Sequence, residues 1–133
     1  MSADGAVYLD SSALVKLLVT EAETAALLAH LRGGGRRAAC ALVRVEVVRA
    51  ARAKDAGMVP AARRVMTGLD LIDVDGPLLD AAADLEDRTL RSLDAIHVAA
   101  ACSLGDDLAE LVTYDRRMAD AARGVGLPVL APS

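Results

Sequence analysis

Short apolar runs alternate along this chain with longer segments in which apolar side chains recur every three or four residues. The runs, rich in Val, Leu and Ile, predict strands at residues 6–9, 37–40, 71–74, 110–114 and 128–130. The longer segments predict helices that begin at Ser11, Glu21, Ala41, Val59, Pro77, Ser92 and Asp115. This alternation predicts an α/β fold with a parallel sheet, and the uninterrupted apolar strands predict helices on both of its faces.

Length and composition narrow the classes of protein that fit this pattern. The 133 residues predict one domain, 1–133, whose core is built from Ala, Val, Leu and Ile because Phe and Trp are absent. A net charge of -4 and 2% aromatic residues argue against a protein that coats nucleic acid or stacks on its bases. We find no signal peptide pattern and no run long enough to span a membrane, so we expect a cytoplasmic protein without membrane association.

The few cysteines and histidines disfavour a zinc site. Cys40 and Cys102 stand in apolar surroundings without CxxC spacing, and we expect two small buried side chains rather than a disulfide or a metal pair. His30 and His97 are the only histidines, too few for the usual zinc ligand sets.

Asp10 is the first acid that does not fit its surroundings. In "AVYLDSSALVKLL" it separates an apolar strand from an apolar helix, where a carboxylate is costly to desolvate unless a cap, a cation or a metal compensates it. It also follows the carboxyl end of a predicted parallel strand, where open α/β sheets bind ligands.

Glu46 is the second such acid. In "ALVRVEVVRAARA" the residues at i-4, i+4 and i+7 from it are Leu42, Ala50 and Ala53, which places this carboxylate on the helical stripe that faces the core. The alternative is an exposed Glu46 that pairs with Arg49 one turn away.

Asp94 and Asp115 each stand at the start of a predicted helix, where capping explains either of them taken singly. Together with Asp10 and Glu46, they predict four carboxylates near the point where the chain order in the sheet reverses. Clustered carboxylates repel one another unless a cation binds. An all-oxygen ligand set suits Mg²⁺ or Mn²⁺, ions that activate water and neutralise phosphodiesters.

Four segments in this order resemble the PIN-domain ribonucleases, in particular the VapC toxins of bacterial type II toxin-antitoxin systems. They are "YLDSSALVKLL", "VEVVRA", "LDAIHVAAA" and "LVTYDRRMADAARGVGLPVL", and the resemblance spans nearly the whole chain. It implies a five-stranded parallel sheet in the order 3-2-1-4-5, flanked by helices, and a Mg²⁺ or Mn²⁺ site. It also implies an endoribonuclease that leaves a 5′-phosphate, a homodimer and a VapB-like antitoxin partner. By matching position, the acids of the metal site are Asp10, Glu46, Asp94 and Asp115.

Further residues receive supporting or neutral roles. Thr113 is interpreted as a supporting ligand. Ser11 and Ser12 are expected to cap the first helix or to orient Asp10, and Ser11 is taken as the supporting residue. His97 is expected to be packed or linked to water rather than a general base, because a metal activates water without it. Lys16 is interpreted as a surface residue.

The remaining charged residues have two interpretations. The arginine pairs would guide an RNA backbone toward the acids, and solvated helix faces explain them almost as well; the pairs are Arg36–Arg37, Arg63–Arg64 and Arg116–Arg117. The spacing of Asp80, Asp84 and Asp87 indicates an amphipathic helix exterior.

Other function classes fit less well. "LIDVDGPLL" superficially resembles the opening motif of haloacid dehalogenase-type phosphatases, but Pro77 replaces its threonine. A response-regulator receiver needs a lysine after its last strands, and the only lysines are Lys16 and Lys54. The alternative that stays open is a non-catalytic or housekeeping PIN-fold module that interacts with RNA, which would be marked by loss of the acids.

Overall fold

The centre of the protein is one parallel sheet with the strand order β3-β2-β1-β4-β5, seen in a computed structural model that describes residues 5–133. Each pair of neighbouring strands runs parallel. The strands are β1 (Ala6–Leu9), β2 (Arg36–Cys40), β3 (Asp70–Ile72), β4 (Leu108–Val112) and β5 (Val129–Leu130). The predicted fold class and the predicted order 3-2-1-4-5 are therefore confirmed.

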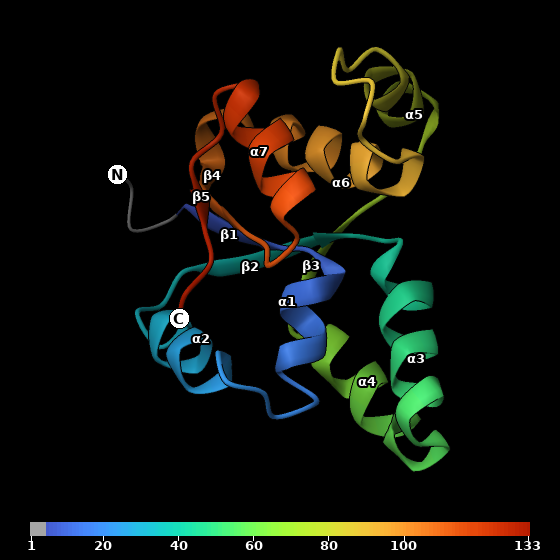
Figure 1. The fold of residues 1–133 in the computed structure, drawn as a ribbon, viewed down its shortest axis with the longest axis vertical. Coiled ribbons are helices and arrows are strands. Elements are labelled where there is room, and N and C mark those ends of the chain that lie inside the picture. The colour runs from blue at the N-terminus through green and yellow to red at the C-terminus, as the bar shows by residue number, and fades with distance from the viewer. Residues whose placement is uncertain (1–4) are drawn as a thin grey trace.

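Helices cover both faces of this sheet, which gives three layers (Figure 1). The α-helices are α1 (Ser11–Lys16), α2 (Thr24–Leu31), α3 (Val43–Lys54), α4 (Val59–Met66), α5 (Gly76–Ala83), α6 (Ser92–Ser103) and α7 (Arg116–Gly124). Two short 3-10 helices, η1 (Ala56–Met58) and η2 (Gly105–Asp107), follow α3 and α6. Helices α1 to α4 lie on one side of the sheet and α5 to α7 on the other. None of the helices between residues 5 and 133 has the length and apolar character of a bilayer-crossing segment.

The alternation of side chains along β1 divides the core into two clusters. Val7 and Leu9 pack with the helices α1 to α4, whereas Tyr8 points to the opposite face and packs with α6 and α7. All three side chains are buried because helices cover both faces. The central strand is thus held on both sides, which fixes the position of the residue that follows it, Asp10.

Several local expectations were wrong, among them element bounds: the strand expected at 110–114 is Leu108–Val112, and the helix expected from Ala41 begins at Val43. The helix expected from Glu21 begins at Thr24, because the Glu21 N–H bonds to the Thr24 hydroxyl instead of starting a helical turn. Cys102 is exposed, since it lies on the outer side of the last turn of α6, and only Cys40 is buried. Lys16 is no surface residue: its side chain is 11% exposed and pairs with Glu23.

The two central strands β1 and β4 end side by side, with Leu9 in register with Val112. From β1 the sheet continues through β2 and β3 in one direction and from β4 to β5 in the other. The carboxyl edge at this reversal is where open α/β sheets bind ligands. Arg36 and Arg37 begin β2 and so lie toward the opposite edge, away from Asp10.

Candidate metal centre

Asp10 is the most deeply buried of the predicted acids, with 1% of its surface exposed. It is the N-cap of α1 and accepts the Ala13 N–H at Oδ1 over 3.0 Å. Oδ1 also accepts the Ser12 hydroxyl at 2.6 Å, and Oδ2 accepts the Thr113 hydroxyl at 2.5 Å. Burial raises the pKa of Asp10 above its usual value, and these hydrogen bonds offset part of the effect because they favour the carboxylate.

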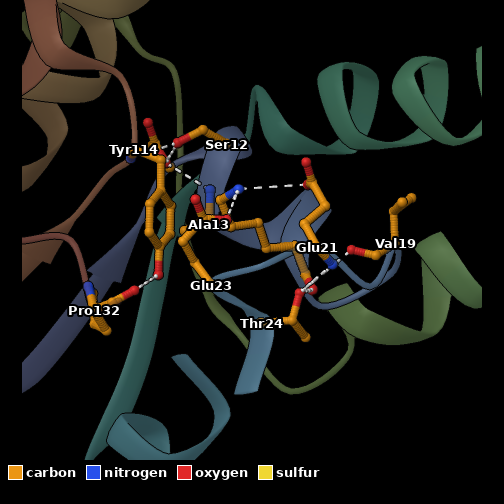
Figure 2. Close-up of polar contacts among 10 residues, drawn as sticks. Ser12, Ala13, Val19, Glu21, Glu23, Thr24, Tyr114 and Pro132 are labelled. Carbon is orange, nitrogen blue, oxygen red and sulfur yellow. Dashed lines mark hydrogen bonds and ion pairs between the residues drawn. The ribbon is translucent and has the colours of Figure 1, made fainter. Parts of the chain in front are cut away.

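The orientation of both hydroxyls is fixed by backbone donors from the loop after β4. Ser12 Oγ accepts the Tyr114 N–H at 2.9 Å, and Thr113 Oγ1 accepts the Asp115 N–H at 3.1 Å. Each hydroxyl therefore directs its own proton toward Asp10. Figure 2 shows Ser12 beside Tyr114, whose hydroxyl in turn reaches the Pro132 carbonyl.

The serine that contacts Asp10 is Ser12. Among residues 5–133, the hydrogen bonds to Asp10 come from Ser12, Ala13 and Thr113, and the side chain of Ser11 supplies none. Neighbouring serines cannot be told apart from the sequence, because their directions depend on how α1 starts after its N-cap. Thr113 contacts Asp10, a hydrogen bond that the sequence does not predict, and its role as a ligand stays a prediction.

Glu46 lies in the first turn of α3, with a side chain that is 21% exposed. Its Oε1 contacts Nε2 of His97 at 2.7 Å, and it forms no ion pair with Arg49 within the described part of the chain. His97 belongs to α6, on the other face of the sheet, so this contact joins the two helical layers at the carboxyl edge. The Arg49 alternative is therefore not what the structure shows, but the stripe through Glu46 is not the core-facing one either: Ala53 is exposed, and the buried side chains of α3 are Val43, Val47, Val48 and Ala51.

His97 is completely buried and packed, as the sequence predicts. Its Nδ1 lies 2.7 Å from the hydroxyl of Tyr8, and that hydroxyl accepts the Cys40 N–H at 3.1 Å. Burial raises the pKa of Tyr8 well above its ordinary value, so the phenol keeps its proton. These contacts could not be predicted from the sequence, because Tyr8, Cys40 and Glu46 are far from His97 along the chain.

Asp94 is half-buried in the first turn of α6 but does not cap it. The N-cap of this helix is Arg91, which makes no side-chain cap bond, and Asp94 has no hydrogen bond with any residue in the described range. Burial raises its pKa first, followed by the negative charge of Asp115, with smaller contributions from Asp10 and Glu46. Capping therefore does not explain Asp94, and its position among other acids does.

Asp115 does cap a helix. Its Oδ1 accepts the N–H groups of Arg117 at 2.9 Å and Met118 at 3.2 Å, at the start of α7. The other oxygen, Oδ2, bonds no residue in the range 5–133. Arg116 and Arg117 are exposed beside it. The predicted cap is confirmed, and one carboxylate oxygen remains for a second role.

The donor set of this edge suits a hard divalent cation, since carboxylate and hydroxyl oxygens are its preferred ligands. The charges of Asp115, Asp10 and Glu46 each contribute to the raised pKa of Asp94. As the side chains stand, however, no three Asp, Glu, His or Cys groups among residues 5–133 converge closely enough to enclose one ion.

Comparison with known proteins identifies the family. The PIN domain model matches residues 7–124. Ribonuclease VapC46 of Mycobacterium tuberculosis is 51% identical over 128 residues, which cover 96% of this chain and 98% of the relative. Ribonuclease VapC47 of the same species is 41% identical over 131 residues, covering 95% and 96%.

Solved structures share the fold. The crystal structure of Mycobacterium tuberculosis VapC20, described as a sarcin-ricin loop cleaving toxin, superposes with a TM-score of 0.75 at 16% identity, over 95% of this chain and 99% of that one. A toxin-antitoxin complex from Klebsiella pneumoniae gives 0.72 at 20% identity, over 96% and 98%. Such identities speak for the fold alone, but the PIN match and the curated relatives go further. The chain belongs to the VapC ribonucleases of the PIN-domain family.

Proposed function

We propose that this chain is an endoribonuclease that uses Mg²⁺, or Mn²⁺ in its place, to hydrolyse RNA phosphodiester bonds and leave a 5′-phosphate. The observation that carries the proposal is the state of Asp94. It makes no hydrogen bond with any residue from 5 to 133, and Asp115, Asp10 and Glu46 add to the burial that raises its pKa. A carboxylate kept in such a place is destabilising unless a cation offsets its charge.

The proposed site residues have two roles, holding the ion and orienting its ligands. Asp10, Glu46, Asp94 and Asp115 would hold the ion, while Ser12 and Thr113 keep the Asp10 carboxylate in one orientation. A bound divalent ion supplies Lewis acid chemistry, lowering the pKa of water and neutralising phosphate charge. Ribonucleases of this kind are generally metal-dependent.

RNA must reach an acidic edge that by itself repels phosphate. Arg116 and Arg117 are the predicted pair that lies beside it, exposed at the start of α7 next to Asp115. We propose that they contact the RNA backbone, since arginine binds phosphate oxygens and adds affinity without reading sequence. Arg36 and Arg37 are left out of this role by their place near the opposite edge.

A VapB-like antitoxin is the proposed partner, in keeping with the toxin-antitoxin complexes that share this fold. We propose that it inhibits by placing an Arg or Lys against the four carboxylates, because a guanidinium pairs with carboxylates through two hydrogen bonds. Action as a homodimer in the cytoplasm, which the family resemblance implies, completes the proposal.

The test is an RNA cleavage assay with purified protein in Mg²⁺, in Mn²⁺ and in EDTA, with product ends analysed. Wild type is expected to cleave with either ion and to leave 5′-phosphates, while EDTA and the variants Asp10→Asn and Glu46→Gln lose nearly all activity. Lys54→Gln, at the far end of α3, is the control and keeps full activity. Undiminished cleavage in EDTA would contradict the metal dependence. RNA binding without cleavage would support the non-catalytic alternative.

A further inference from the structure

The buried groups next to Glu46 form a chain of hydrogen bonds in which each proton has a single acceptor. The Cys40 N–H donates to the Tyr8 hydroxyl at 3.1 Å, and a backbone N–H has no other role than donor. The hydroxyl must then place its own proton elsewhere, and the acceptor within reach is Nδ1 of His97 at 2.7 Å. No buried side-chain oxygen or nitrogen in the range 5–133 is left without a partner.

These hydrogen bonds determine which nitrogen of the His97 imidazole carries the proton. Since Nδ1 accepts from Tyr8, the ring proton sits on Nε2, which donates to Glu46 Oε1 at 2.7 Å. A doubly protonated ring would leave the Tyr8 proton without an acceptor, in a site where Tyr8 and His97 are both 0% exposed. The two rings pack edge-on, with 79° between their planes.

We infer that Tyr8 and His97 are positioning residues that hold Glu46 Oε1 so that its second oxygen faces the other carboxylates. This inference rests on the proposed function, because it takes Glu46 as one of the ion-binding acids. Glu46 has no other hydrogen bond in the described range, so without His97 its side chain is free to adopt other rotamers. Groups that orient a ligand in this way commonly change metal affinity by about 10- to 100-fold when they are removed.

The tautomer can be tested without any activity measurement. Imidazole nitrogens of ¹⁵N-labelled protein distinguish the Nε2–H, Nδ1–H and doubly protonated forms by NMR. The chain has two histidines, so the spectrum of His30→Gln assigns the remaining signals to His97. At neutral pH we expect the Nε2–H form. A proton on Nε2 supports the inference, and the Nδ1–H form would overturn it, because Nε2 would then have no proton to donate to Glu46.

Mn²⁺ binding by calorimetry then tests the consequence. Tyr8→Phe keeps the ring and removes the hydroxyl, His97→Gln keeps an N–H donor, and His97→Leu keeps only volume. We expect the dissociation constant to rise by about tenfold or more in His97→Leu, less in His97→Gln, and severalfold in Tyr8→Phe, with a lower kcat and an unchanged KM for RNA. His30→Gln, which removes a histidine paired with Glu110, is the matched control and stays at the wild-type value.

The outcomes separate the two proposals. If folded Tyr8→Phe and His97→Gln bind Mn²⁺ as wild type does while Glu46→Gln does not, the positioning role is wrong and the proposed function stands. If Glu46→Gln and Asp10→Asn also bind as wild type does, the ion site itself is wrong. Circular dichroism shows which variants fold, and Tyr8→Phe keeps the test decisive if His97→Leu does not.

Discussion

Thr113, at the end of β4, donates a hydrogen bond of 2.5 Å to Asp10, at the end of β1. The same hydroxyl accepts the Asp115 N–H, so one side chain links three elements: β1, β4 and the cap of α7. Thr113 and Asp10 are each 1% exposed, so water does not replace the hydrogen bond between them. The edge of the sheet that carries the acids is therefore fixed by hydrogen bonds as well as by packing.

Thr113→Val removes this hydroxyl and keeps the shape of the side chain. It leaves Asp10 Oδ2 and the Asp115 N–H without their partner, which is expected to lower the free energy of unfolding by about 1–3 kcal/mol. Urea unfolding measures the change. Thr113→Ser keeps the hydroxyl and is the control; equal losses in both variants would mean that the hydrogen bonds contribute nothing.

The strand order and the unusual acids could be predicted from the sequence for a physical reason. Apolar runs and helical periodicity depend on local order alone, so they predict the elements, and a carboxylate such as Asp10 next to a buried strand stands out against them. The resemblance to PIN domains then supplied the strand order. Element bounds were less accurate, as at Thr24, because hydroxyl and N–H contacts decide where a helix starts.

The contacts among side chains were out of reach. The sequence places Tyr8 in a strand and predicts His97 as a packed residue. Their link to Glu46 forms only where α3 and α6 meet at the edge of the sheet. Lys16 was misplaced for a similar reason: its ammonium lies 4.7 Å from the centre of the Tyr114 ring, 98 positions along the chain. Pattern analysis finds which residues are unusual, but not which of them touch.

Asp94→Asn separates an ion ligand from a structural cap. Burial and neighbouring acids raise the pKa of Asp94, so its charged form opposes folding at pH values above that pKa. In EDTA at neutral pH the variant is expected to melt at the wild-type temperature or higher. Wild type gains about 2.7 kcal/mol from Mg²⁺ at a hundred times the dissociation constant, and the variant gains much less. Melting curves with and without Mg²⁺ measure both effects; a lower melting point in EDTA with an undiminished Mg²⁺ response would make Asp94 structural.

Asp115 has two roles that different substitutions separate. Asp115→Asn keeps an oxygen for the N–H groups of Arg117 and Met118 and is expected to keep stability while lowering RNA cleavage less than Asp10→Asn does. Asp115→Ala loses the cap as well, at a cost of about 1 kcal/mol. Urea unfolding and cleavage rates on the two variants test this, and equal stability of both would exclude the cap.

The pairing of Lys16 with Glu23 gives a pH dependence with a definite sign. Lys16 donates a hydrogen bond of 2.9 Å to Glu23 and lowers the pKa of that carboxyl group. The stabilisation is therefore complete above the unfolded-state pKa of about 4.3 and disappears as the pH falls through the lower folded value. Glu23→Gln is expected to lower the urea midpoint at pH 7 but not at pH 2.

Glu86→Gln is the control for that experiment, because Glu86 is exposed and has no ion pair in the described range. Its urea midpoint is expected to match wild type at both pH values. A Glu23→Gln effect of the same size at pH 7 and at pH 2 would contradict the assignment to the ion pair with Lys16.

The central claim is that four carboxylates from separate elements share one divalent ion, and an anomalous difference map from crystals soaked in Mn²⁺ tests it most directly. The account predicts one strong peak at the carboxyl edge of β1 and β4, bounded by Asp10, Asp94 and Asp115 with Glu46 nearby, and no such peak in crystals of Asp10→Asn. A peak only at other acids, such as Asp84 and Asp87, or the same peak in Asp10→Asn, would contradict it.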